Sequence, residues 1–281
     1  MEHSTDNETS LTGSLAKGLA VLAVFGPDNP SMGVSEIARL VQINRATAYR
    51  IVSALTSLGF LEQIDRGGGR REYRPGLKVL LLGRAALESL ELPELALPYL
   101  QQLQAQVGET VNMAILDGAS IVYILRLKTD IIVNIRLFVG SRLSAHCTSM
   151  GKAMLAFLAE DELDTILAQI DYQPLTERTA RGREQLLADL ENVRRLGFAV
   201  NDQELALGLR SVAAPVFNRH RVVAAVNIAV PAGRVGYDRV SQDLGPAIRN
   251  TAQRISSALS ELSSPEMAMP GALSGTEASR R

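Results

Sequence analysis

The sequence contains one cysteine, three histidines and no tryptophan among its 281 residues. The single cysteine, Cys147, excludes an internal disulfide and is typical of a protein in the reducing cytosol. The histidines are His3, His146 and His220, and their wide spacing leaves no standard zinc motif, so we expect no metal and no cofactor. No uninterrupted apolar run is long enough to span a bilayer. Residues 1–10 are polar and have no apolar signal core, so we expect a cytoplasmic protein without a membrane partner.

Charge is distributed unevenly along a chain whose net charge is only −1. Residues 11–84 contain ten Lys/Arg and five Asp/Glu, whereas the rest of the chain contains 19 basic and 25 acidic residues. A basic segment beside an acidic remainder indicates that only the N-terminal part meets nucleic acid. Chance clustering is the alternative, because the excess of basic residues is small.

Residues 34–63 organise the chain, and they are typical of two helices joined by a short turn and followed by a strand. We expect Ser35 to cap the first helix and Asn44 to cap the second. Apolar residues then recur at helical spacing, and Gly59 follows the last of them, where a left-handed residue commonly ends a helix. The polar side of this second helix and its flanks consist of Arg45, Ala46, Thr47, Tyr49, Arg50 and Ser53.

This polar side is suited to the major groove of DNA. An arginine can contact guanine edges, and small or hydroxylic residues allow close approach to thymine methyls and phosphates. Two helices with a short turn, the second carrying the polar face, form the helix-turn-helix arrangement. An ordinary helical hairpin with a solvated face is the alternative.

A basic hairpin is predicted directly after these helices. Residues 60–64 and 72–74 are strand-like, and the tip between them contains three glycines. A hairpin with a basic tip behind a recognition helix is typical of a wing that contacts the phosphate backbone or the minor groove. The arginines of this tip are Arg66, Arg70 and Arg71.

Two further helices are predicted around this region. Leu15, Leu19 and Leu22 recur at helical spacing and predict a helix that completes a three-helix core. Residues 77–90 predict a helix that is apolar almost all round, so it must be buried on more than one side. We expect it either to pack against its copy in a second chain or to lie between two domains of its own chain.

Beyond residue 108 the pattern changes to strands broken by hairpin signals, with helices before, between and after them, which predicts an antiparallel α+β domain. The strands are expected at 110–116, 121–127, 131–139, 198–200, 211–217 and 222–230, and the helices at 93–107, 149–158, 183–196 and 244–262. The expected organisation is a disordered tail (1–10), a winged helix-turn-helix domain (11–76), a linker and dimerisation helix (77–92), an effector-binding domain (93–263) and a second disordered tail (264–281).

Catalytic patterns are weak in this second domain. His146 and Cys147 are neighbours, and neighbours on a strand point to opposite faces, so they make no dyad. Asp202 and Glu204 lie near a strand end, with capping or solvent contact as the favoured interpretation. Ligand binding fits better, because small and hydroxylic residues from Ser149 begin a helix whose free N–H groups can hold an anion. Lys152 is set aside, because it can point to solvent from the first turn.

Six stretches, in this order and spacing, resemble the IclR family of bacterial transcription regulators over residues 11–263. They are SLAKGLAVL (14–22), VSEIARLV (34–41), ATAYRIVSALTSLGFLE (46–62), LPELALPYLQQLQAQVGETVNMAILDGASIVYILR (92–126), VGSRLSAHCTSMGKAMLA (139–156) and LGFAVNDQELALGLRSVAAPV (196–216).

The resemblance implies a winged helix-turn-helix, a linker helix and a GAF-like effector domain, assembled as a homodimer or a dimer of dimers on double-stranded operator DNA. The central pattern is similar to the branch that controls protocatechuate, hydroxybenzoate and catechol breakdown. It therefore implies a small organic acid as effector, an aromatic acid or its ring-cleavage product. Residues 45–50 depart from the Arg-Arg pair of that branch, so no operator sequence is carried over. The implied effector positions are Leu143, Ser149, Met150, Asn201, Leu209, Ser211, Asn227 and Ala229.

We therefore expect a sequence-specific DNA-binding transcriptional regulator controlled by a small carboxylate, and not an enzyme. The alternative is a small-molecule enzyme with an N-terminal regulatory DNA-binding appendage. Turnover of a candidate acid by residues 93–263 alone would favour the enzyme, whereas effector-dependent retention of an operator by the intact chain would favour the regulator.

Overall fold

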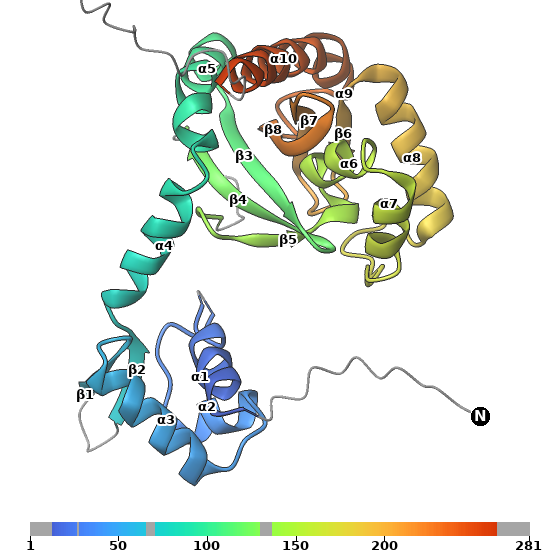
Figure 1. The fold of residues 1–281 in the computed structure, drawn as a ribbon. Coiled ribbons are helices and arrows are strands. Elements are labelled where there is room, and N and C mark those ends of the chain that lie inside the picture. Colours follow the sequence, from blue (N-terminus) through green and yellow to red (C-terminus); the bar gives the residue numbers. More distant parts are fainter. Residues whose placement is uncertain (1–12, 27, 66–70, 130–136, 263–281) are drawn as a thin grey trace, which may run out of the picture. The chain divides into compact units, whose positions relative to one another are not determined.

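The computed structural model describes residues 13–26, 28–65, 71–129 and 137–262, and Figure 1 shows its elements in chain order. The chain divides into two compact units, residues 1–89 and 90–281. The expected tails, 1–10 and 264–281, lie outside the described residues, as do Arg66 and Arg70.

The first unit contains three helices around a small apolar core: α1 (Ser14–Ala23), α2 (Val34–Leu40) and α3 (Arg45–Ser57). The predicted cap of α3 is confirmed, because Asn44 Oδ1 accepts a hydrogen bond from the Thr47 N–H over 2.8 Å. Gly59 has a φ of +81°, as expected for the residue that ends this helix. The core consists of Val21, Met32, Ile37, Val41, Val52, Leu61 and Tyr73.

Two predictions about these helices are wrong. The N-cap of α2 is Gly33, and no side chain caps that helix, so Ser35 is not its cap. On α1, Leu15 and Leu19 are exposed, and the fully buried residue is Val21. The helix was predicted at the right place, but helical spacing alone does not say which of several apolar sides the rest of the unit covers.

The wing is present as the antiparallel hairpin of β1 (Leu61–Asp65) and β2 (Arg71–Pro75). Tyr73 in β2 also exchanges backbone hydrogen bonds with Met32, which precedes α2, so the hairpin is joined to the helices. Helix α4 (Lys78–Glu88) follows the wing. The structure buries none of its side chains, and Leu77, Leu80, Leu81 and Leu82 are 60–80% exposed in this single chain.

The second unit is built on one six-stranded antiparallel sheet in the order β5-β4-β3-β8-β7-β6. The expected α+β class is therefore confirmed. The strands are β3 (Thr110–Asp117), β4 (Ser120–Leu127), β5 (Arg142–Ser144), β6 (Ala199–Asp202), β7 (Leu209–Asn218) and β8 (Arg221–Pro231). Of the strand predicted at 131–139, residues 131–136 lie outside the described residues, and 137–139 form no strand.

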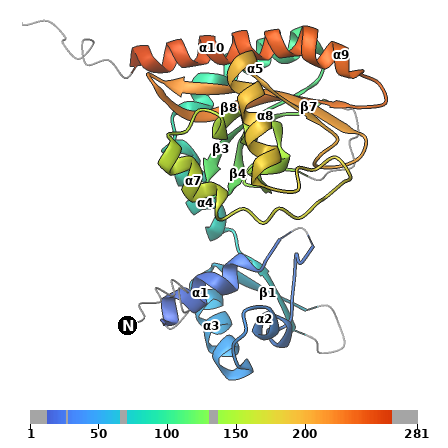
Figure 2. The same ribbon diagram turned by 90° about the vertical axis from the view of Figure 1, so that its right-hand side faces the viewer.

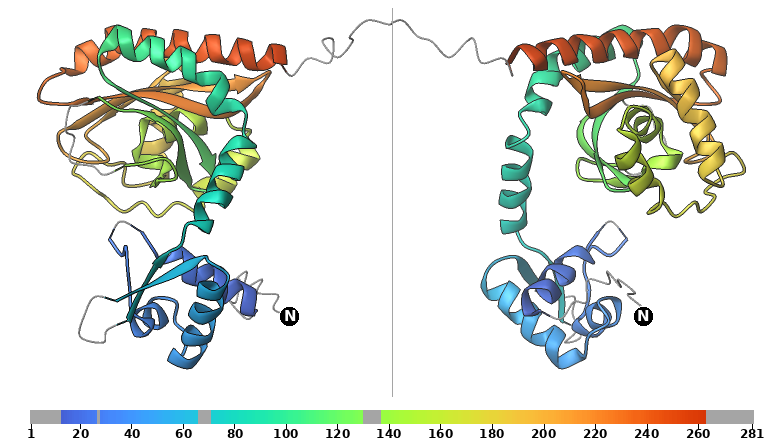
Figure 3. Two further views of the ribbon diagram at one scale, coloured as in Figure 1. Left: turned by 90° about the vertical axis from the view of Figure 1, so that its left-hand side faces the viewer. Right: turned by 45° about the vertical axis from the view of Figure 1, so that its right-hand side comes forward.

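Helices cover both faces of this sheet. Helix α5 (Leu92–Val107) and helix α10 (Gly245–Leu262) lie side by side over one face, as both views of Figure 3 show. Figure 2 shows α10 running along that face. The opposite face is covered by α6 (Ser149–Leu155), with α7 (Glu160–Leu167) and α8 (Arg183–Leu196) beyond it. A short helix, α9 (Tyr237–Arg239), and a π-helical turn, Val240–Leu244, lead into α10.

The two faces of the sheet differ in side-chain character because successive strand residues point to opposite sides. Buried Val212, Val226 and Ile228 alternate with small or polar residues such as Ser211, Ala213 and Asn227 along the same strands. Ala213 belongs to the apolar cluster that includes α6, so the small and polar side is the side that α6 covers. In the described part of the chain, no helix is long and apolar enough to cross a membrane.

Candidate functional site

The predicted recognition face of α3 is exposed to solvent. Arg45, Ala46, Arg50 and Ser53 are exposed, and Tyr49 is 54% exposed. Thr47 is half-buried, and its N–H is bound by the Asn44 cap. A helix whose buried side holds Ala48 and Val52 therefore presents donors, cations and small side chains outward, as contact with base edges in a major groove requires.

A groove of about 1110 Å³ borders this face within the first unit. It runs between the start of α2, the start of α3 and strand β2. Among the described residues, three cations line it, Arg39, Arg45 and Arg71, against a single carboxylate, Glu36. Arg39 was not among the predicted DNA-binding residues. It could have been identified from the sequence as a basic residue in the last turn of α2, outside the apolar stripe of that helix.

The second unit brings predicted effector residues together on the α6 side of the sheet. Asn201, Ser211 and Ala229 are register partners across β6, β7 and β8, so their side chains point the same way. Above them, the hydroxyl oxygens of Ser149 and Ser211 are 2.8 Å apart. Asn201 donates from Nδ2 to the Cys147 carbonyl over 2.6 Å, which attaches the sheet to the turn before α6.

The remaining predicted effector positions lie on the same side. Met150 is fully buried at the start of α6, and Leu143 on β5 packs against the cluster that contains it. Leu209 and Asn227 are buried on β7 and β8. The cap of α6 is Thr148, whose Oγ1 accepts from the Gly151 N–H over 3.1 Å. Ser149, the next residue, is therefore not the cap.

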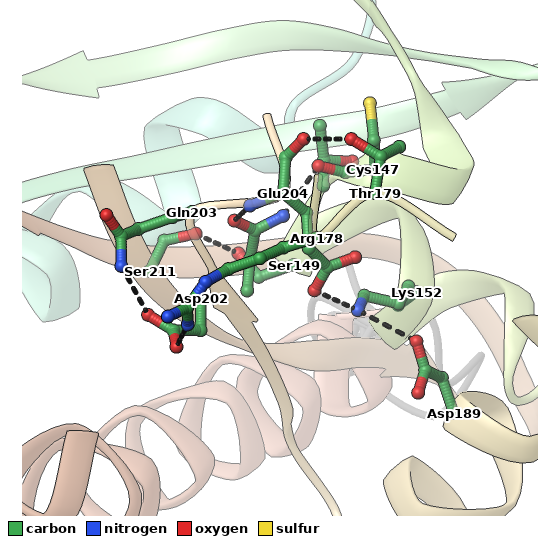
Figure 4. Close-up of polar contacts among 12 residues, drawn as sticks. Cys147, Ser149, Lys152, Arg178, Thr179, Asp189, Asp202, Gln203, Glu204 and Ser211 are labelled. Atoms are coloured by element: carbon green, nitrogen blue, oxygen red, sulfur yellow. Dashed lines mark hydrogen bonds and ion pairs between the residues drawn. The ribbon is translucent and has the colours of Figure 1, made fainter. Parts of the chain in front are cut away.

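Lys152, which was set aside because it can point to solvent from the first turn, is buried. Its Nζ donates to Glu204 Oε1 over 2.5 Å and to Asp189 Oδ2 over 3.2 Å (Figure 4). The side chains of Lys152 and Glu204 are only 4% and 10% exposed, whereas Asp189 is 39% exposed. Burial raises the pKa of Glu204, although the charge of Lys152 opposes that shift. The predicted solvent contact of Glu204 is wrong.

The loop after β6 connects this ion pair to the predicted effector residues. The Glu204 N–H donates to Asn201 Oδ1 over 3.2 Å, and the Glu204 carbonyl accepts from Thr179 Oγ1 over 2.6 Å. Asp202 pairs with Arg210 over 2.6 Å and also with Arg178. Burial works against the charge of Asp202, but the bond and charge of Arg210 outweigh it and hold its pKa below the ordinary value.

A second cavity, of about 590 Å³, lies between α8 and β6. Lys152, Asp189, Glu204 and Asp202 line it together with Arg178. The eight predicted effector positions are all described, and none of them lines this cavity. Its walls contain comparable numbers of basic and acidic groups, so they favour neither an anion nor a cation.

His146 and Cys147 do not form a nucleophile–base pair of the kind that catalysis requires. They lie in a buried 3₁₀ turn, residues 145–147, and not on the strand that was assumed for them. Burial raises the pKa of the Cys147 thiol to about 11, so the reactive thiolate is scarce at neutral pH. Burial lowers the pKa of His146. Among the described residues, no group of three His, Cys, Asp or Glu is placed to hold a metal ion.

Each of the two units matches a known protein-family model, and both models describe parts of the same kind of regulator. Residues 14–65 match the family model described as IclR helix-turn-helix domain. Residues 84–257 match the model described as bacterial transcriptional regulator IclR C-terminal.

Individual relatives agree with these matches. The Pca regulon regulatory protein of Pseudomonas putida is 37% identical over 237 residues, which are 84% of this chain and 80% of that protein. The HTH-type transcriptional repressor AllR of Escherichia coli K12 is 35% identical over 248 residues, 88% of this chain and 90% of that protein. The crystal structure of a transcriptional regulator from Rhodococcus sp. RHA1 is 42% identical, with a TM-score of 0.75, and the match covers 89% of this chain and 98% of that one.

Proposed function

The chain belongs to the IclR family of bacterial transcriptional regulators, and from this membership we propose how it recognises an operator and which effector controls it. The first unit binds double-stranded operator DNA in the cytosol with α3 in a major groove. The second unit binds an aromatic carboxylate, and this binding changes the affinity for the operator. The observation that carries the proposal is the exposed face of α3 beside a groove with three arginines.

On the DNA side, two kinds of contact follow from the geometry. Arg50 and its exposed neighbours on α3 contact base edges, because a bidentate arginine is the commonest contact to guanine. Arg39 at the end of α2 and Arg71 on the wing line the protein groove beside α3. They lie to the side of the helix that enters the DNA major groove, so they contact and neutralise backbone phosphates. Ser53, one turn after Tyr49, extends the same face along the groove. Arg66 and Arg70 remain predicted wing contacts outside the described residues.

On the ligand side, the proposed site is the row of polar side chains beneath the start of α6. Ser149, Ser211 and Asn201 supply hydroxyl and amide donors for a carboxylate. Leu143, Met150, Leu209 and Ala229 supply apolar surface for the body of an acid. The similarity to the Pca regulon regulatory protein supports an aromatic acid, or its ring-cleavage product, as the effector. Both curated relatives described above are regulators, and neither favours the enzyme alternative.

Assembly as a homodimer, or as a dimer of such dimers, is part of the proposal. Four leucines of α4 and its start are 60–80% exposed in the single chain. So many exposed large apolar side chains on one helix are unusual for a monomer and indicate an interaction site. The proposed partner of this surface is α4 of a second copy of the chain. Pairing through α4 yields a dimer, and a dimer with two helix-turn-helix units can bind two operator half-sites.

Operator binding with and without acids tests the proposal. Promoter fragments from the neighbourhood of the gene are titrated with the intact protein in a mobility-shift assay, at several salt concentrations. One fragment is expected to bind tightly with a steep salt dependence, and an aromatic acid is expected to change that affinity. Turnover of the same acid by the protein, with no effect on DNA binding, would support the enzyme alternative and overturn the proposal.

A further inference from the structure

A buried asparagine that was not among the predicted effector residues lies on the α6 side of the sheet. Asn112 on β3 is only 2% exposed. It is the register partner of Asn227 on β8, and its Nδ2 donates to Asn227 Oδ1 over 2.7 Å. Two residues further along β3, Ala114 belongs to the cluster that contains α6, so Asn112 points to the same side. The predicted position Asn227 thus has a partner on β3, 115 residues away in the chain, that no local sequence pattern indicates.

One polar atom of this amide pair is unsatisfied. Asn112 Oδ1 is buried and has no hydrogen-bond partner within the described part of the chain. Most buried polar groups are hydrogen-bonded, because an unpaired one has lost its water without gaining a replacement. An amide oxygen only accepts, so the missing group is a hydrogen-bond donor.

The separation of Asn112 and Ser211 along and across the strands suits a small ring between them. Ser211, Ala229 and Thr110 are aligned across β7, β8 and β3, and Asn112 is two residues beyond Thr110. Strand spacing and rise therefore separate the Ser211 and Asn112 Cα atoms by about 12 Å. Because both side chains point to the α6 side of the sheet, their polar atoms are separated by a similar distance. After a hydrogen bond of about 2.8 Å at each end, the remaining gap matches the span of two substituents on opposite sides of one aromatic ring.

We propose that Asn112, held by Asn227, is the specificity-determining residue for a ring hydroxyl of the effector, opposite the carboxylate. The inference rests on the proposed function and deepens it, because it narrows the effector to a hydroxylated aromatic acid. The carboxylate lies at Ser149 and Ser211, and the hydroxyl donates to Asn112 Oδ1. An acid without that hydroxyl leaves the oxygen unpaired and binds more weakly.

Titration calorimetry with three acids tests this inference. The intact protein is titrated with 4-hydroxybenzoate, 4-fluorobenzoate and benzoate; fluorine is close to a hydroxyl in size but donates no hydrogen bond. The parent is expected to bind 4-hydroxybenzoate about tenfold more tightly than 4-fluorobenzoate, the worth of one buried hydrogen bond. Asn112→Ala should abolish this preference, because the variant has no side-chain acceptor for the ring hydroxyl.

Val111→Ala is the matched control, since Val111 is fully buried on the same strand but points to the opposite face. It should weaken folding while keeping the preference for the hydroxyl. A preference that survives Asn112→Ala, or an equal loss for all three acids, overturns the inference and leaves the proposed function standing. If Asn112→Ala does not fold, the titration of the parent alone tests the inference. Equal affinity of the parent for 4-hydroxybenzoate and 4-fluorobenzoate overturns the inference. A parent that binds none of the three acids overturns both the inference and the proposed aromatic effector.

Discussion

Lys152 on α6 and Glu204 after β6 form a nearly enclosed ion pair, with Nζ 2.5 Å from Oε1. Glu204 also donates its backbone N–H to Asn201, while Ser149, three residues before Lys152, is hydrogen-bonded to Ser211. The pair therefore holds the start of α6 against the strands that contain the proposed effector residues. Removal of one partner leaves the other charge buried without a counter-ion. Such a change therefore lowers stability more than the same change in a surface ion pair.

Loss of Lys152 should destabilise the second unit strongly. Lys152→Met leaves Glu204 without its cation and is expected to lower the free energy of unfolding by about 3 kcal/mol. The double change Lys152→Met with Glu204→Leu should recover most of that loss, because no uncompensated charge remains buried. Urea unfolding measures both. Arg183→Met, which removes the exposed partner of Asp164, is the control and should change stability by less than about 1 kcal/mol. Equal effects of the two single changes would show that the Lys152–Glu204 pair behaves as a surface pair.

The pH dependence of stability should carry the signature of Glu204. Its pKa in the folded chain is raised above the ordinary 4.5, mainly by burial, so the folded state holds this proton more tightly than the unfolded state. The stability it contributes is present below pH 4.5 and is lost as the pH rises through the folded pKa. The free energy of unfolding of the parent and of Glu204→Gln is measured from below pH 4.5 upward through the folded pKa of Glu204. The parent should lose stability relative to the variant as the pH rises; a relative gain would mean that Lys152 outweighs burial.

The two classes of DNA contact should respond differently to mutation. Arg50→Ala is expected to weaken operator binding by about 1–3 kcal/mol and to relax base preference at one position. Arg71→Ala should weaken binding to all sequences similarly and reduce the slope of log affinity against log salt by about one. Mobility shifts on an operator library at several salt concentrations separate the two. Unchanged base preference in Arg50→Ala would mean that α3 reads DNA through other residues.

Helix α4 should hold two chains together. Replacement of Leu80 and Leu81, both more than 60% exposed in the single chain, by glutamate is expected to yield monomers or insoluble protein, because charge is introduced into an apolar interface. Analytical ultracentrifugation measures the assembly. Leu207→Glu is the matched control, since Leu207 is 75% exposed on a loop of the second unit, and it should leave assembly intact. A soluble dimer of unchanged affinity after the α4 changes excludes this interface.

Binding of the effector carboxylate should depend on the Ser149 hydroxyl. Since Ser149 is 1% exposed and Thr148 is the cap, an aspartate at this position would bury a charge, and alanine is the cleaner substitution. Ser149→Ala is expected to weaken binding of the acid by about 1.5–3 kcal/mol, the range for a hydrogen bond to a charged group.

Thr148→Ala is the control for that change. It removes the cap and should cost about 1 kcal/mol of stability while retaining the hydroxyls that contact the ligand. Calorimetric titration and thermal unfolding of the two variants distinguish ligand contact from helix stability. Equal binding by Ser149→Ala and the parent would place the carboxylate elsewhere.

The sequence by itself determined the elements whose signals are short-range. Helix α8 begins and ends where periodicity predicted, and Gly197 after it has a φ of +76°. The Asn44 cap and the β3–β4 hairpin, with Gly118 at φ +57°, were also predicted. Caps, turn residues and spacing act within a few residues of the chain, so local chemistry is enough to read them.

Only the tertiary structure decided which distant groups meet. Glu204 is 52 residues from Lys152, and Asn227 is 115 residues from Asn112. No spacing rule pairs such groups, because strand order and the helix that covers each sheet face determine their distances. The same reason explains why α1 buries Val21 and exposes Leu15: an apolar side chain is buried only where another element packs against it.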